Sequence, residues 1–432
     1  MDIRQLYEIY REHPVITTDS RDCPKGSIFI ALKGESFDGN KFASSALDKG
    51  CAYAIVDEKE YADTTDSRCV LVDDALRTFQ ALAREHRRHF DIPVIGITGT
   101  NGKTTTKELV AAVLSERHNV LFTQGNFNND VGVPKTLFRL TPDHDIAVVE
   151  MGASHPGDIK VLVETVEPHY GIITNVGKAH LQGFGSFEGV IKTKGELYDY
   201  LRHRPDSEVF IDAGNSNLMG IADGLQLIKY GIGDIPGLCV RGEVVECAPF
   251  LHLRWTDGKE WYDVTTHLIG SYNIYNMLAA ATIGLRFGIT PQEICHALSS
   301  YVPGNNRSQL TDTGRNHLIV DAYNANPTSM MAALRNFRDM HVDNKMAILG
   351  DMRELGESSA EEHQKVVDFL SEAGLTQVWL VGEEFAKTEC SFQKFHDVDE
   401  VRAAIAARDI RDHYILIKGS NGIKLFLLPE TL

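Results

Sequence analysis

A lysine and a threonine follow a glycine-bearing turn, a combination of residue types that suits phosphate binding. Residues 96–105 read Gly-Ile-Thr-Gly-Thr-Asn-Gly-Lys-Thr-Thr, after an apolar run that begins at Val94. Backbone N–H groups in such a turn cradle phosphates, and the N-terminus of the following helix adds positive potential. We expect Lys103 to reach the terminal phosphates of ATP and the Thr104 hydroxyl to bind Mg²⁺. The loop is a variant, because Ile97 stands where the usual pattern has glycine, and an ordinary strand-to-helix turn is the alternative interpretation.

Two candidate metal ligands follow other apolar runs. Glu150 ends the run 146–149, and His180 lies shortly after the run that ends at Thr174. Ligand sites of open α/β sheets gather at the carboxyl ends of strands, so this placement indicates a Mg²⁺–ATP site. Taken singly, the carboxylate also suits a helix cap and the histidine suits a local hydrogen bond. Lys194, on an expected helix, has by itself the ordinary interpretation of a solvated lysine.

Asparagines gather in two further segments. One is 126–129 (Asn-Phe-Asn-Asn), and the other places Asn273 and Asn276 at the start of a small-residue helix. An asparagine side chain both donates and accepts hydrogen bonds, which suits nucleobase or peptide edges. Because asparagine is equally common in turns and caps, both interpretations stay open.

The elements that must position these residues fall into three blocks, with predicted boundaries at 1–91, 92–303 and 304–432. Short apolar runs at 27–32 and 52–56 and a helix over 75–89 predict a small N-terminal α/β domain. Runs at 94–98, 146–149 and 171–174 with helical patterns between them predict a central P-loop domain, built on a mostly parallel sheet flanked by helices. Strands at 318–320, 346–349, 378–381 and 414–417, with helices at 329–340 and 359–373, predict a C-terminal Rossmann-like αβ domain.

Composition excludes several classes of protein. The 432 residues carry a formal net charge of −17, which disfavours a nucleic-acid partner. No run approaches the roughly 18 apolar residues of a membrane span, and the start lacks the layout of a signal peptide. The seven cysteines are scattered and never spaced Cys-x-x-Cys, which favours reduced thiols. We therefore expect a cytoplasmic protein without membrane insertion, and a monomer.

Together these segments resemble the Mur ligase family over essentially the whole chain. The resemblance lies in an ordered set of short motifs at 18–21, 31–34 with 38–39, 99–104, 125–129 with Gly132 and Pro134, 150–152, 174–180, 194–196, Asn273 with Asn276, 321–327 and 349–352. Segments 18–21, 128–129 and 323–327 resemble the branch of the family that adds a dipeptide. The Asp-Asn-Pro-[Arg/Asn] signature of the meso-diaminopimelate-adding branch does not occur in the sequence.

The resemblance implies an ATP-dependent amide ligase of peptidoglycan precursor synthesis. Such an enzyme joins D-alanyl-D-alanine to UDP-MurNAc-tripeptide through an acyl phosphate, giving UDP-MurNAc-pentapeptide, ADP and phosphate. The third residue of the tripeptide stays open between meso-diaminopimelate, lysine and another diamino acid.

The resemblance also implies roles for individual residues. They are: catalytic, Lys103, Lys194 and His180; ATP-binding, Gly99, Thr100, Asn101, Gly102, Lys103, Thr104, Thr105, Asn273, Asn276, Arg307 and Asp321; UDP-substrate-binding, Ser20, Arg21, Asn128 and Asn129; dipeptide-binding, Asn324, Asn326 and Asp351; metal-binding, Thr104, Glu150, His180 and a carbamylated Lys194. Carbamylation by CO₂ would reverse the charge of Lys194 and supply oxygen ligands, which Mg²⁺ prefers.

Two other functions stay open at this point. One is another ligase of the same family, adding an earlier stem residue or adding glutamate to folate. The other, from a different class, is a P-loop ATPase without ligase activity, which would release phosphate whether or not an amine acceptor is present.

Overall fold

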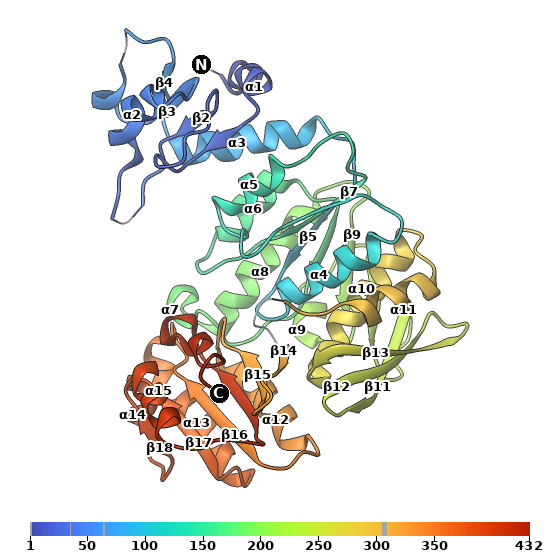
Figure 1. Ribbon diagram of the computed structural model, residues 1–432. Coiled ribbons are helices and arrows are strands. Elements are labelled where there is room, and N and C mark those ends of the chain that lie inside the picture. The colour runs from blue at the N-terminus through green and yellow to red at the C-terminus, as the bar shows by residue number, and fades with distance from the viewer. Residues whose placement is uncertain (1, 35, 64, 305–308) are drawn as a thin grey trace.

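The chain forms three sheets, each built from one continuous stretch of sequence (Figure 1). The computed structural model describes residues 2–34, 36–63, 65–304 and 309–432, so Arg307 lies outside the described residues. In Figure 1 the N-terminal and C-terminal parts lie at the two ends of a crescent whose middle is the central part. Within the described part of the chain, no helix combines the length and apolar character needed to cross a bilayer.

The N-terminal sheet is small and wholly parallel, in the order β1-β2-β3-β4. Its strands are β1 (Ile16–Thr17), β2 (Ile28–Ile30), β3 (Tyr53–Val56) and β4 (Cys69–Leu71), with helices α1 (Ile3–Glu12), α2 (Ala43–Asp48) and α3 (Ala75–Arg88). Ile28, Ile55 and Phe79 are fully buried between the sheet and its helices. At the end of α3 the buried Arg87 donates a hydrogen bond to the carbonyl of Val166 (3.0 Å), which ties this part to the central one.

The central sheet has nine strands in the order β13-β12-β11-β10-β9-β8-β5-β7-β6. Its strands are β5 (Val94–Thr98), β6 (Val120–Phe122), β7 (Ile146–Glu150), β8 (Tyr170–Ile173), β9 (Glu208–Asp212), β10 (Leu227–Ile232), β11 (Val240–Cys247), β12 (Phe250–Thr256) and β13 (Trp261–Ile269). The strands from β6 to β11 are parallel, which confirms the predicted mostly parallel sheet, whereas β12 and β13 extend it in antiparallel fashion and were not predicted. The flanking helices are α4 (Lys103–Leu114), α5 (Gly132–Leu137), α6 (Asp158–Val166), α7 (Leu181–Phe184), α8 (Phe187–Arg202), α9 (Ser216–Met219), α10 (Ile274–Arg286) and α11 (Pro291–Ser300).

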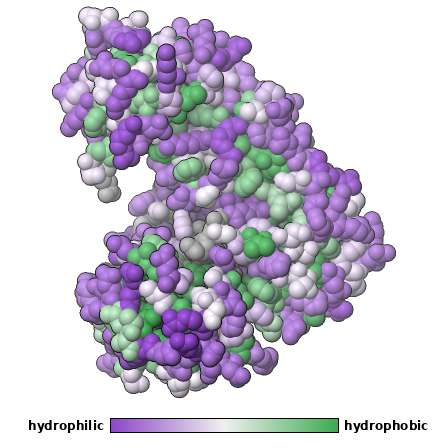
Figure 2. Space-filling view, viewed as in Figure 1, coloured by the Kyte–Doolittle hydropathy of each residue, from purple (hydrophilic) through white to green (hydrophobic). Residues whose placement is uncertain are grey.

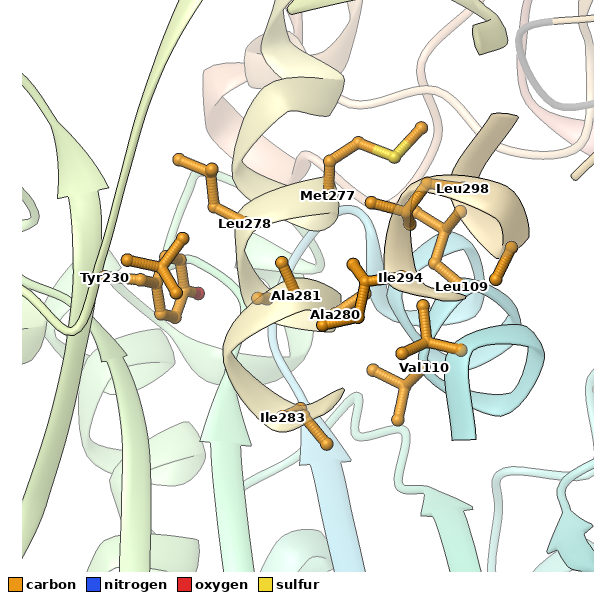
Figure 3. Packing of buried hydrophobic residues seen from close by; sticks show 14 of the residues in the cluster. Leu109, Val110, Tyr230, Met277, Leu278, Ala280, Ala281, Ile283, Ile294 and Leu298 are labelled. Atoms are coloured by element: carbon orange, nitrogen blue, oxygen red, sulfur yellow. The ribbon is translucent and has the colours of Figure 1, made fainter. Parts of the chain in front are cut away.

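Helix α10 packs against both the phosphate-loop helix α4 and helix α11. Figure 3 shows Leu109 and Val110 of α4 and Ile294 of α11 facing the small residues of α10. Gly284 permits this approach, because a Cβ there would lie 2.5 Å from Cγ1 of Val113. Close packing of this kind fixes the start of α10 beside the start of α4.

The C-terminal sheet has the order β14-β15-β19-β16-β17-β18. Its elements are β14 (Gln309–Asp312), β15 (His317–Asp321), α12 (Pro327–Asp339), β16 (Lys345–Gly350), α13 (Ser359–Glu372), β17 (Gln377–Val381), α14 (Glu383–Ala386), β18 (Gln393–Phe395), α15 (Val398–Ala406) and β19 (Tyr414–Lys418). Only β14 runs antiparallel to its neighbour among these described strands, so the predicted Rossmann-like αβ architecture is confirmed.

The C-terminal part contacts the central part through the segment that follows β8. Lys178 Nζ donates to a carboxylate oxygen of Glu362 (2.8 Å), and Lys178 N donates to Thr328 Oγ1 (3.2 Å). The backbone N–H of Gln182 donates to the carbonyl of Glu354 (3.2 Å). These contacts hold the two parts in the arrangement that Figure 1 shows.

Candidate functional site

The loop between β5 and α4 has a shape that only glycine permits at one position. Gly99 has φ +141°, and a Cβ there would lie 2.1 Å from Thr174 Oγ1. That hydroxyl donates to the carbonyl of Asn101 (2.6 Å), while Thr100 N donates to the carbonyl of Asn175 (2.9 Å). Ile97 is a buried residue of β5, so the departure from the usual glycine pattern lies within the strand and leaves the turn intact.

The lysine and threonine of this loop open helix α4. Lys103 Nζ donates to the carbonyls of Gly99 (2.8 Å) and Thr100 (3.0 Å), which folds its ammonium over the loop. Lys103 and Gly102, at the start of α4, line the same cavity. The arrangement suits a phosphate group, as the sequence predicts.

Beside the loop lies a buried carboxylate that is only half satisfied. Glu150 is fully buried at the end of β7, and its Oε1 accepts hydrogen bonds from Thr104 Oγ1 (3.2 Å) and Asn128 Nδ2 (2.8 Å). Its Oε2 is buried and has no hydrogen-bond partner among the described residues. A buried, unpaired carboxylate oxygen is costly, and a cation at this point would satisfy it.

The donor set around Glu150 fits Mg²⁺. A threonine hydroxyl and a carboxylate oxygen are hard ligands, and Mg²⁺ in proteins takes few of them and completes its shell with phosphate oxygens and water. In the described ranges, no group of three or more His, Cys, Asp or Glu side chains forms a metal cluster. A site completed by nucleotide phosphates does not need one.

Lys194 is buried on α8 and is not a solvated lysine. Its side chain is 2% exposed, with Nζ 3.4 Å from the carbonyl of Ala153 and 5.3 Å from the ring centre of Phe184. Burial, with a smaller contribution from the charge of Lys103, lowers the pKa of Lys194 to about 7. A large fraction of this amine is therefore uncharged at neutral pH.

His180 lies between the central and C-terminal parts. Its Nδ1 contacts the carboxylate of Glu354, although that atom has no aligned hydrogen bond among the described residues. Burial lowers the pKa of His180, the charge of Lys103 acts in the same direction, and Glu354 opposes both. A neutral imidazole is the form that binds a metal.

These residues surround one cavity of about 1420 Å³ that all three parts of the chain line. Figure 2 shows the hollow of the molecule on the concave side of the crescent. The predicted site residues in its wall are Thr100, Asn101, Gly102, Lys103, Thr105, Asn128, Asn129, Glu150, His180, Asn273, Asn276, Asp321 and Asn324. Gly99, Thr104 and Lys194 lie directly behind this wall, where the contacts above place them.

Four other predicted site residues do not line the described cavity wall. Their contacts are with other groups of the protein. Arg21 is exposed and pairs with Asp19 through Nε and Nη2 (2.9 and 2.7 Å), and Ser20 contributes its carbonyl to a hydrogen bond from Lys49 (2.6 Å).

The other two of these residues are predicted dipeptide ligands. Asn326 caps α12 and exchanges side-chain hydrogen bonds with Asn101 of the phosphate loop (2.8 and 3.4 Å). Asp351 accepts from the backbone N–H groups of Glu384 and Phe385 (both 2.9 Å), which caps α14. Both side chains therefore have structural partners, and their contacts to a dipeptide stay a prediction.

The wall also contains residues that the sequence analysis missed. Asp74, Arg77 and Gln80, at the start of α3, form its N-terminal side. On the C-terminal side Lys418 is fully buried, and its Nζ lies 2.5 Å from Asp321 Oδ2. Lys418 ends an apolar strand, so the rule that selected Glu150 applies to it equally.

Three family models match the chain in succession. They are the Mur ligase family, catalytic domain, over residues 14–95, the Mur ligase middle domain over 97–284, and the Mur ligase, glutamate ligase domain, over 306–421. Together the matches span most of the chain, including the phosphate loop and the C-terminal sheet.

Individual proteins are similar along nearly the full length. The UDP-N-acetylmuramoyl-tripeptide--D-alanyl-D-alanine ligase of Bacillus subtilis is 33% identical, over 96% of this chain and 92% of the relative. The ligase of that name from Escherichia coli is 35% identical, over 85% of this chain and 81% of the relative. Among solved structures, MurF from Acinetobacter baumannii superposes with a TM-score of 0.89 at 29% identity, covering 99% of this chain and 97% of that one. MurF from Thermotoga maritima in complex with ADP gives 0.87 at 25% identity, covering 96% of both. The chain belongs to the Mur ligase family.

Proposed function

We propose that the protein is an ATP-dependent amide ligase that joins D-alanyl-D-alanine to UDP-MurNAc-tripeptide. The observation that supports this most is the single cavity whose wall combines a phosphate loop with side chains of both flanking parts. A plain ATPase needs only the loop, whereas a ligase must bring a nucleotide, a carboxylate and an amine together. The proposed substrates are those in the names of the similar ligases from Bacillus subtilis and Escherichia coli.

In the first step, an oxygen of the tripeptide's terminal carboxylate attacks the γ-phosphorus of ATP, and ADP leaves. Lys103 and the N–H groups at the start of α4 hold the phosphates and offset their charge. In the second step, the dipeptide nitrogen attacks the acyl carbon and phosphate leaves, with loss of one proton from the nitrogen. Closure of the flanking parts around the cavity would keep water from the acyl phosphate.

Thr104, Glu150 and His180 would hold Mg²⁺. The unpaired buried Oε2 of Glu150 supports this assignment, together with the Thr104 hydroxyl on Oε1. When bound, the ion supplies charge compensation on the phosphates.

Lys194 would react with CO₂ to form a carbamate, with release of one proton. The lowered pKa supports this reaction, because only the neutral amine is a nucleophile. The carbamate would supply two oxygens and a negative charge near the carbonyl of Ala153, and these oxygens would be further ligands for the ion.

The flanking parts would divide the substrates between them. Residues 1–91 would hold the UDP end with Ser20 and Arg21, and Asn128 and Asn129 would lie along the substrate in the central domain, 92–303. Residues 304–432 would supply Arg307 and Asp321 to the nucleotide and Asn324, Asn326 and Asp351 to the dipeptide.

The test is phosphate release from ATP with Mg²⁺ and UDP-MurNAc-tripeptide, with and without D-alanyl-D-alanine, and with mass detection of the pentapeptide product. Tripeptides with meso-diaminopimelate and with lysine are run in parallel. Lys103→Ala should abolish release, and Lys135→Ala, an exposed lysine of α5, is the matched control. Phosphate release that is indifferent to the dipeptide would refute the ligase and favour a P-loop ATPase.

A further inference from the structure

One part of the cavity wall has no role in the site described so far. It lies where β9 ends and α10 begins, and it includes Asp212, Gly214, Asn215 and Tyr275. Asp212 is the last residue of β9 and is 8% exposed. A nearly buried carboxylate in a cavity wall needs hydrogen-bond donors, and a ligand in the cavity can supply them.

The two asparagines that the resemblance assigns to ATP binding are already hydrogen-bonded within the fold. Asn276 Nδ2 donates to Asn273 Oδ1 (2.8 Å), and Asn276 Oδ1 accepts from Thr106 Oγ1 (3.0 Å). Asn273 Nδ2 donates to the carbonyl of Ile269 (2.8 Å). Together with the packing in Figure 3, these bonds anchor α10 against the phosphate-loop helix. These bonds use part of the hydrogen-bonding capacity of each amide and hold the wall in place. A carboxylate in the same wall offers a further acceptor for the base.

The order of the strands determines which way the nucleotide extends. Thr104 and Glu150 mark the metal and terminal-phosphate end, over β5 and β7. β8 and then β9 lie on the opposite side of β5. A triphosphate whose terminal end lies over β7 therefore directs its nucleoside toward β9, where the cavity continues to Asp212 and Tyr275.

The chemistry of this part of the wall suits an amino-purine. Asp212 Oδ1 accepts the backbone N–H of Gly214 (3.0 Å), and a carboxylate has about four acceptor sites in all. Burial raises the pKa of the Asp212 carboxyl, and burial together with Asp212 raises that of Tyr275. Tyr275 lines the same part of the cavity, and an aromatic side chain there can stack on a purine. Adenine presents an N6 amine as a donor.

We propose that Asp212 accepts a hydrogen bond from the exocyclic amine of the adenine of ATP and so selects the nucleotide. The inference rests on the ATP site of the proposed function. Asp212 is then a specificity-determining residue, which contacts the base and takes no part in the phosphoryl transfer.

The experiment compares binding of ATP, of purine riboside 5′-triphosphate, which lacks the amine, and of 2′-deoxy-ATP by isothermal titration calorimetry. The wild type should bind ATP about tenfold to hundredfold more tightly than the analogue without the amine, the range expected for a hydrogen bond to a charged group. In Asp212→Ala the affinity for ATP should exceed the affinity for the analogue by no more than about threefold. Asp212→Asn, which keeps the shape of the side chain, should lower the ratio severalfold because a neutral acceptor is about half as strong.

Asp234→Ala is the matched control, since Asp234 is an exposed aspartate of the loop after β10 and pairs with Arg241 (3.2 Å). It should keep the wild-type ratio. Equal losses for ATP and for the analogue in both Asp212 variants would overturn the inference, because a purely structural role lowers both affinities alike. Loss of discrimination against 2′-deoxy-ATP alone would also overturn it, in favour of a ribose contact.

The outcome is distinguishable from failure of the proposed function. Calorimetry measures nucleotide binding without ligation, so a protein that makes no pentapeptide can still show the selectivity ratio. A wild type that binds ATP and the analogue without the amine equally overturns the inference even where ligation is found.

Discussion

The buried lysine of α8 should cost the protein stability, and removing its charge should restore it. The change is Lys194→Met, which keeps the length of the side chain and its contact with Phe184. The expected result is a more stable protein that no longer ligates, because methionine cannot form a carbamate. Lys192→Met, at an exposed position of the same helix, is the matched control and should change the free energy of unfolding by no more than about 0.5 kcal/mol.

The magnitude follows from the pKa of about 7, against an ordinary value of 10.5. Below pH 7 the lysine is protonated in both states, and its full burial penalty is present. Between pH 7 and 10.5 the unfolded chain binds more protons than the folded chain, so this group's contribution to stability rises with pH. At pH 7 the penalty is about 4 kcal/mol, and at pH 9 about 2 kcal/mol. The free energy of unfolding of Lys194→Met should therefore exceed that of the wild type by about 4 kcal/mol at pH 7 and about 2 kcal/mol at pH 9.

The assay is hydrogen–deuterium exchange of the α8 amides, which reports the opening free energy of the central domain. It is run at pH 7 and pH 9 in CO₂-depleted buffer, so that carbamate formation does not remove the ammonium. The comparison is made between variant and wild type at each pH, because other groups titrate in the same range. A variant no more stable than wild type at pH 7, or a difference that does not shrink at pH 9, would refute the reasoning.

Three further changes test the loop and its surroundings. Glu150→Gln removes the unpaired buried charge and should raise the Mg²⁺ concentration for half-maximal ligation at least tenfold. The urea midpoint of unfolding should stay unchanged or rise. A lower midpoint with unchanged Mg²⁺ dependence would contradict the metal role. Gly99→Ala places a Cβ against Thr174 at a backbone angle that alanine rarely adopts. ATP binding measured by calorimetry should weaken more than tenfold. Unchanged affinity would show that the loop adapts to the Cβ. Asn101→Ala and Asn326→Ala should show a coupling energy of about 1 kcal/mol in a double-mutant cycle on ATP affinity, and strict additivity would mean that their contact is not felt by the nucleotide site.

The local parts of the site were predictable from the sequence. The loop after β5 depends on glycine conformation and on the order strand, turn and helix, which neighbouring residues determine. Glu150 was found because carboxyl ends of parallel strands meet at one edge of a sheet. The same rule covers Asp212 and Lys418, each the last residue of its strand.

Contacts between distant segments were not predictable. Asn273 and Asn276 have the residue type and spacing of a base-binding pair, which stays a prediction, and in the fold they also bond each other, Thr106 and the carbonyl of Ile269. Which partner an amide takes depends on how α10 packs against α4, and spacing within α10 holds no information about that. The antiparallel strands β12 and β13 were not predicted, and residue types along 250–269 do not determine which sheet edge they extend.

The docking of the C-terminal part follows from contacts of modest strength. The hydrogen bonds of Asn101 with Asn326, of Lys178 with Glu362 and of Lys178 N with Thr328 each contribute about 0.5–1.5 kcal/mol. Their sum is a few kcal/mol, comparable to the differential binding energy that shifts a two-state equilibrium. Because Asn101 belongs to the phosphate loop and Asn326 caps α12, a nucleotide that reorients the loop acts directly on the docked arrangement. We therefore expect nucleotide binding and the position of the C-terminal part to be linked through a pair of side chains 225 residues apart.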